Sequence, residues 1–137
     1  MKKAILVLVF LIGGWMQAQT ISLEVKMTGF RTDAGNVKVG LYNNEDDFLR
    51  KVFKNAVVDI KNGTASVTFK DLPKGTYAVS VYHDENNNGK MDKNTFHIPT
   101  EGYGTSNDAK GFMGPPKYED AKFAVAKNAK VNIKLNY

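Results

Sequence analysis

The chain has 137 residues, no cysteine and a formal net charge of +5. The absence of cysteine excludes disulfides, thiolate metal sites and catalytic thiols, and the length fits one domain behind a leader. The lysines that make the chain basic are scattered among apolar residues instead of forming a stripe, which argues against a nucleic-acid-binding surface.

Residues 1–19 have the layout of a secretory signal peptide. Two lysines follow the first residue, and an apolar run over residues 4–12 comes next. This run is shorter than the ~20 apolar residues that a membrane-spanning helix needs. We therefore expect export with cleavage after Ala18 or Gln19. The mature domain, residues 20–137, is expected to have no lipid anchor and no membrane span.

Seven segments alternate apolar and polar residues with a period of two, which predicts half-buried strands. They are residues 21–27, 37–41, 58–60, 65–69, 77–83, 123–125 and 131–135. Asn62 and Gly63 lie between the third and fourth segments, and both tolerate the positive φ of a two-residue hairpin. The pattern predicts an all-β fold, a seven-stranded antiparallel β-sandwich of immunoglobulin-like or transthyretin-like type.

One stretch departs from this alternation. Between residues 44 and 54, apolar side chains recur at i,i+4 spacing, acids open the stretch and bases close it. Acids at the start and bases at the end complement a helix dipole. We predict one short helix here, with Asn44 as its N-cap, covering an open edge of the sandwich.

A long segment, residues 84–120, contains five glycines and three prolines. It is too rich in apolar residues for disorder, so we expect a long ordered loop. We expect its apolar side chains to pack inward as a satellite cluster: Phe96, Ile98, Tyr103, Phe112, Met113 and Tyr118.

The start of this segment carries oxygen atoms at alternate positions, the layout of a Ca²⁺ loop, because Ca²⁺ takes about six to eight oxygen ligands. The candidate ligands are Asp84, Asn86, Asn88, Asp92 and the Lys90 carbonyl, with Gly89 allowing the turn. The spacing follows the first nine positions of an EF-hand loop. However, Thr95 stands where the twelfth-position glutamate belongs. The missing ligand is Glu101, Asp108 or Asp120, and the sequence does not choose among them.

Other interpretations of these residues remain open. The loop is also compatible with a metal-free turn, since Asn and Gly tolerate left-handed backbone. His83 and His97, with Asp92 or Glu101, form a weaker zinc or copper candidate. No nucleophile elbow or phosphate-cradling loop occurs, so we predict a protein that is not an enzyme.

A cation at this loop would order the segment that follows it. We expect that segment to present Glu101, Tyr103, Ser106 and Asn107 to an envelope protein, a peptide or a glycan. The protein is expected to act as a monomer in the periplasm or outside the cell. The alternative is a carbohydrate- or peptide-binding module in which the turn is structural and binds no ion.

Several stretches also resemble a known family. Residues 72–92, 98–107 and 114–121 resemble a bacterial secreted family, domain of unknown function 2141. The resemblance covers nearly the whole mature chain, and it implies an exported β-sandwich with no established activity. Residues 72–92 are also similar to transthyretin-like and carboxypeptidase-regulatory-like domains. Those are generally accessory or binding modules, but a shared fold does not transfer function.

Overall fold

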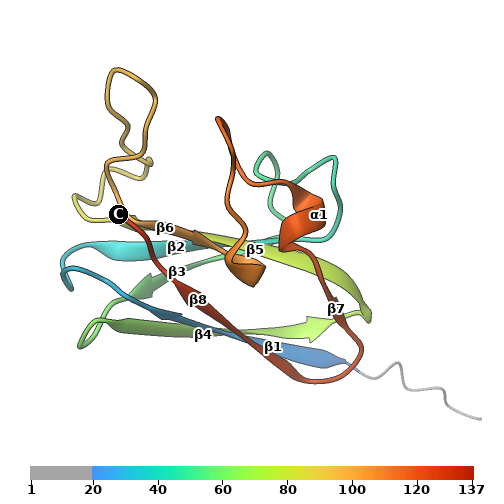
Figure 1. Ribbon diagram of the computed structural model, residues 1–137. Helices are drawn as coiled ribbons and strands as arrows, with labels where there is room; N and C mark the ends of the chain where they lie inside the picture. The colour runs from blue at the N-terminus through green and yellow to red at the C-terminus, as the bar shows by residue number, and fades with distance from the viewer. Residues whose placement is uncertain (1–19) are drawn as a thin grey trace, which may run out of the picture.

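The computed structural model describes residues 20–137, and the predicted signal peptide lies outside them. The elements, in chain order, are β1 (Ile21–Thr28), β2 (Asn36–Tyr42), β3 (Lys54–Asp59), β4 (Thr64–Leu72), β5 (Gly75–Asp84), β6 (Tyr103–Thr105), the 3₁₀ turn η1 (Ser106–Asp108), α1 (Tyr118–Ala121), β7 (Phe123–Val125) and β8 (Ala129–Lys134). They form two facing sheets (Figure 1). No helix of the described residues is long and apolar enough to cross a membrane.

One sheet has the strand order β4-β1-β8, and the other has the order β3-β2-β5-β6, with β7 paired to β5. The predicted all-β, two-sheet architecture is therefore confirmed, but the count of seven strands is wrong. The eighth strand is β6, whose three residues pair with β5 from Ser80↔Thr105 to Tyr82↔Tyr103. It was missed because three residues around a glycine show no alternation.

The prediction of a wholly antiparallel fold is also wrong, because β1 and β8 are parallel from Leu23↔Ala129 to Thr28↔Lys134. Alternation tells which side chains face the core, but it does not tell the direction of the neighbouring strand. Nearly the whole domain separates these two strands in the chain, so no hairpin constrains their direction. The Asn62-Gly63 hairpin is confirmed, with φ values of 52° and 71°.

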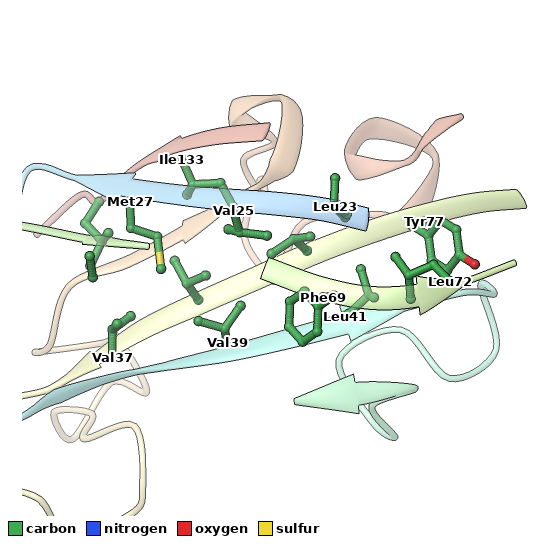
Figure 2. Close-up of a cluster of buried hydrophobic side chains, with 14 of the residues drawn as sticks. Leu23, Val25, Met27, Val37, Val39, Leu41, Phe69, Leu72, Tyr77 and Ile133 are labelled. Carbon is green, nitrogen blue, oxygen red and sulfur yellow. The ribbon is translucent and has the colours of Figure 1, made fainter. Parts of the chain in front are cut away.

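The main core lies between the two sheets, where every second side chain of β1 and β2 is buried (Figure 2). Figure 2 shows Leu23, Val25 and Met27 of β1 opposite Val39 and other apolar side chains of the second sheet. Burial of this kind is worth about 1.5–3 kcal/mol for each large apolar side chain. The core fixes the frame from which the long segment after β5 projects.

The helix predicted over residues 44–54 is wrong. The stretch consists of turns that end where β3 begins, with amide bonds such as Arg50 N to Asp47 O at 2.9 Å. Asn44 still caps the first turn, because its Oδ1 accepts the Asp47 amide at 2.9 Å. Leu49 has a φ of 59°, which interrupts any continuous right-handed helix.

A short helix instead occurs at α1, at the end of the long segment. Its Tyr118 and Ala121 pack with Phe48, Tyr42 and Ala78 in a second apolar cluster on the outer side of the five-stranded sheet. The rings of Phe48 and Tyr118 meet edge-on with centroids 5.6 Å apart. The i,i+4 spacing that predicted a helix therefore has another cause. The Phe48 ring anchors a turn to the sheet, and a buried ring can anchor a turn as well as a helix.

Candidate cation-binding loop

The loop begins at the end of β5, which lies in close contact with the turn before β2. Asp84 is the last residue of β5, is fully buried, and pairs with Asn36 of β2. Gly35 has a φ of 72°, and a Cβ there would collide with the Asp84 carbonyl and the Glu85 backbone. A glycine is therefore required for this turn to lie against the end of β5.

The carboxylate of Asp84 closes the turn that follows it. Its Oδ1 accepts the amide of Asn88 at 3.2 Å, and its Oδ2 accepts the amide of Gly89 at 2.9 Å. Asn87 and Gly89 have φ values of 55° and 77°, the left-handed region that their residue types tolerate. The hydroxyl of Tyr82 donates to the Gly89 carbonyl at 3.2 Å. The turn over residues 84–89 is thus wrapped around the Asp84 side chain.

Asp92 lies across the turn from Asn86 and Asn88, the two asparagines among the candidate ligands. The amide nitrogens of Asn86 and Asn88 donate to its two carboxylate oxygens at 2.6 and 2.7 Å. The bond from Asn88 and then that from Asn86 lower the pKa of Asp92 below its usual value. Four of the predicted ligand side chains, Asp84, Asn86, Asn88 and Asp92, are therefore gathered in one turn.

Glu101 is the acid that the fold brings to this turn. It is buried, and its two oxygens accept the amides of Glu85 at 3.2 Å and Asp92 at 3.1 Å. Burial raises the pKa of Glu101, and the nearby charges of Asp92 and Asp84 raise it further. Of the three acids left open by the sequence, Asp108 and Asp120 belong to η1 and α1, and only Glu101 bonds to the loop.

One buried oxygen at this place accepts no hydrogen bond. The amide nitrogen of Asn36 donates to Asn87, but Asn36 Oδ1 is the one buried side-chain polar atom of the described residues that lacks a partner. No three acidic or histidine side chains within residues 20–137 already stand as a metal-ligand set. Any cation site here has to draw on amide and carbonyl oxygens as well.

The neighbouring histidine is engaged in a different network. His83 is fully buried, with Nε2 2.6 Å from the Ala34 carbonyl and Nδ1 2.8 Å from the Tyr137 hydroxyl. Both ring nitrogens are therefore used inside the protein, which removes His83 from the zinc or copper candidate. The carbonyl requires a proton on Nε2, so in the neutral ring Nδ1 accepts from Tyr137.

Tyr137 and Arg31 complete that network and were not predicted. The Arg31 guanidinium lies 4.6 Å from the centre of the Tyr137 ring, and its Nε donates to Glu85 at 2.6 Å. This bond lowers the pKa of Glu85 below its usual value. These partners are 54 or more residues apart in the chain, and no local pattern signals such a pairing.

Comparison with known proteins places the chain in a family. Residues 25–134 match the sequence model of DUF2141, described as uncharacterised proteins conserved in bacteria. The chain belongs to this family. No curated protein matches it. A solved structure of the pilus-presented adhesin Spy0125 (Cpa), in mutant form, is similar over 85% of this chain and 27% of the adhesin, with 14% identity and a TM-score of 0.31.

The four residues predicted to present a ligand surface lie in different environments of this DUF2141 domain. Glu101 is buried against the loop, as described above. Ser106 is also buried, and its hydroxyl donates to the Ala121 carbonyl at 2.6 Å and accepts the Val79 amide at 2.9 Å. The side-chain amide nitrogen of Asn107 donates to the Lys122 carbonyl at 2.8 Å. Of the four, Tyr103 on β6 is the large exposed side chain.

The predicted satellite cluster is wrong for most of its members. Tyr118 is buried, as expected, but Phe96, Ile98, Phe112 and Met113 are exposed. Composition shows that the segment is ordered but does not show which way its apolar side chains point. In this DUF2141 chain, the long segment is held by polar bonds and by one aromatic anchor.

Proposed function

We propose that this protein is an exported, non-enzymatic module in which the turn over residues 84–92, together with Glu101, binds Ca²⁺. The observation that carries the proposal is the gathering of Asp84, Asp92 and Glu101 around one turn. Within residues 20–137, none of these three carboxylates forms an ion pair with a lysine or arginine. Burial is the main cause of the raised pKa of Glu101, the nearby charges of Asp92 and Asp84 raise it further, and a bound cation would offset both effects.

The donor set fits a hard cation. Carboxylates, asparagine amides and the Lys90 carbonyl offer oxygens, which suit Ca²⁺ better than the nitrogen and sulfur donors typical of zinc. The orphan Oδ1 of Asn36 is a further oxygen at the same turn. A cation would supply positive charge to neutralise the three acids. For this, Asn86 and Asn88 would turn their amide oxygens inward from the arrangement in which their nitrogens bond Asp92.

The role of such a cation would be to order the chain between β5 and β6. Asp84 ends β5, and Glu101 stands two residues before β6, so a shared cation would tie the two strands' ends together. Affinity is expected at the weak end of the range for calcium sites, about 10⁻⁴–10⁻³ M, because the carboxylates are few. Such a site suits a compartment with abundant Ca²⁺, consistent with the export expected from residues 1–19.

The non-enzymatic part of the proposal rests on how the reactive groups are used. Both ring nitrogens of His83 and both carboxylate oxygens of Glu101 are bonded inside the protein. A general acid or base needs one such atom directed at a substrate. Neither group is therefore available for proton transfer without rearrangement of the loop.

The competing function is a binding module with a metal-free turn, and a specific observation favours it. The carboxylates of Asp84 and Asp92 are already satisfied by backbone and amide N–H groups. A turn that needs no ion would have such bonds. The two candidates differ in whether Ca²⁺ changes the stability of the domain.

Calorimetric titration of residues 20–137 with Ca²⁺ separates them. We expect saturable binding that is lost in Asp84→Asn and retained in Asp120→Asn, a matched control in which the acid is an exposed residue of α1. Mg²⁺ should bind more weakly, because it demands near-octahedral geometry that a flexible loop does not supply. Absence of saturable heat, or equal heats in wild type and Asp84→Asn, would support the metal-free turn instead.

A further inference from the structure

Two loops of the long segment hold large apolar side chains out in water. Phe96 and Ile98 are 80% and 57% exposed, and Phe112 and Met113 are 92% and 95% exposed. On most soluble proteins, exposed large apolar side chains are scattered singly over the surface. Their grouping at loop tips marks an interaction site.

The first loop is ordered by hydrogen bonds of its own. Residues 92–100 form a small hairpin in which the Thr100 amide donates to the Asp92 carbonyl and the Asn94 amide to the Ile98 carbonyl, both at 2.9 Å. Asn94 Oδ1 accepts the amides of Phe96 and Ile98 at 2.9 and 3.1 Å. The backbone is thus satisfied internally, while the two apolar side chains at the tip are left in water.

The second loop turns sharply at its tip. A Cβ on Gly111 would collide with the carbonyl of Gly114, so residues 111–114 fold back on themselves tightly. Met113 has a φ of 55° within this turn. Phe112 and Met113 therefore lie exposed in a tight turn, while Ser106 before it and Tyr118 after it are buried.

Both loops project to the same side of the molecule. Figure 1 shows the chain around residue 95 and the chain around residue 112 rising from the five-stranded sheet, on the side away from β4, β1 and β8. The tips are separate protrusions from this side.

The two tip segments carry lysines as their charged residues, while acids such as Asp92, Glu101 and Asp108 lie at the bases of the loops. Residues 93–100 and 109–117 contain Lys93, Lys110 and Lys117 and no aspartate or glutamate. Lysine stems lie along apolar surface while their ammonium groups stay in water, the usual arrangement at a lipid headgroup layer. Basic residues next to apolar tips favour a negatively charged bilayer.

We propose that the domain docks reversibly on an anionic phospholipid surface, with Phe96, Ile98, Phe112 and Met113 inserted at the headgroup boundary. A fluid bilayer can close around separate convex tips, which a preformed protein groove cannot do without matching their spacing. This peripheral docking differs from membrane spanning. It does not rest on the proposed cation, because the hydrogen bonds that build the hairpin at residues 92–100 are formed by the protein alone.

Tryptophan fluorescence tests the insertion directly. The chain's one tryptophan is Trp15, so residues 20–137, which include all eight strands and both apolar clusters, contain none. Phe96→Trp and Phe112→Trp each place a single reporter at one tip. With vesicles of phosphatidylglycerol and phosphatidylethanolamine, we expect a blue shift and quenching by brominated acyl chains in both variants. Thr68→Trp, on the exposed face of β4 in the other sheet, should show neither.

Vesicle flotation tests which residues carry the binding. We expect Phe96→Ser/Ile98→Ser and Phe112→Ser/Met113→Ser each to weaken binding at least tenfold, while Val57→Ser, which removes an exposed apolar side chain from β3, leaves it unchanged. Phosphatidylcholine vesicles, or Lys110→Gln/Lys117→Gln, should bind less. Circular dichroism of the serine variants checks that the fold is retained.

Other outcomes overturn the proposal. Absence of a blue shift at both tips, or serine variants that bind vesicles as wild type does, would exclude docking through these loops. Self-association that the same serine variants abolish, without vesicle binding, would assign the tips to a second copy of the chain. Running each experiment with Ca²⁺ and with chelator separates this proposal from the cation site, since docking through both tips is expected in either condition.

Discussion

The two halves of the segment between β5 and β7 are ordered by different physical means. Residues 84–101 are held by carboxylates and amides around Asp84 and Glu101. Residues 106–121 are held by the buried hydroxyl of Ser106 and the aromatic anchor Tyr118. We therefore expect the first half to respond to pH and, if the proposed site binds Ca²⁺, to cations, whereas the second half depends on packing.

Truncating the aromatic anchor should have the largest effect. Tyr118→Ala removes a buried ring from the second cluster and should lower the free energy of unfolding by about 3 kcal/mol. Tyr118→Phe should be nearly neutral, because the hydroxyl's bond to the Thr76 carbonyl is long, at 3.5 Å. Urea denaturation measures both. Equal losses in the two variants would mean that the hydroxyl, and not the ring, anchors this half.

Removal of the buried hydroxyl comes next. Ser106→Ala leaves the Val79 amide and the Ala121 carbonyl without their partner, at a cost of about 1–3 kcal/mol. Ser66→Ala, at an exposed serine of β4, is the matched control and should change stability by less than about 0.5 kcal/mol. If the two alanine variants were equally stable, the hydroxyl would not order the second half.

The first half is expected to respond to Ca²⁺ instead. At ~10 mM Ca²⁺, the expected affinity adds about 1.4–2.7 kcal/mol of stability to residues 20–137. Asp84→Asn should gain little from Ca²⁺, while Ser106→Ala should gain as much as wild type. Thermal unfolding with and without chelator measures the difference. A calcium gain that Asp84→Asn retains would place the cation elsewhere.

The smallest effect is a pH dependence. The pKa of Glu101 is raised in the folded protein, so the folded state binds more protons than the unfolded state. The stability that Glu101 contributes is fully present below the pKa it has in the unfolded chain. It is lost as the pH rises through the pKa it has in the folded protein. Glu85 and Asp92, whose pKa values are lowered, contribute in the opposite sense: their stability is lost as the pH falls.

The difference in unfolding free energy between wild type and Glu101→Gln isolates the contribution of Glu101. In the absence of Ca²⁺, the wild type should lose stability relative to Glu101→Gln as the pH rises through this window, as followed by urea midpoints. Ca²⁺ should reduce that relative loss, because a nearby cation favours the charged carboxylate. Parallel profiles for the two proteins at all pH values would contradict the assigned direction.

Much of the fold was predictable because alternation reports directly on which side chains face a core. The β1 and β2 patterns and the Asn62-Gly63 hairpin are local signals of this kind. The direction of β8 was not predictable, since it depends on a pairing across nearly the whole domain. The i,i+4 pattern around Phe48 misled for a related reason: a single ring buried against distant Tyr118 leaves the local backbone free to form turns.

The candidate site was predictable only in part. The run of oxygen-bearing residues from Asp84 to Asp92 is a local pattern, and the structure brings its side chains into one turn. The choice of Glu101 over Asp108 and Asp120 depends on where β6 returns to the sheet, which no short pattern contains. The direction of Phe112 was likewise not predictable, because composition does not tell whether an apolar loop residue finds a surface to cover it.

Terbium luminescence tests the central claim most directly. Tb³⁺ occupies calcium sites and emits when a nearby tyrosine is excited, and Tyr82 bonds to Gly89 within the turn. We predict saturable emission from residues 20–137 that Ca²⁺ displaces, that Tyr82→Phe strongly reduces and that Asp84→Asn abolishes. Emission that does not saturate, or that persists unchanged in Asp84→Asn, would contradict a cation site at this loop.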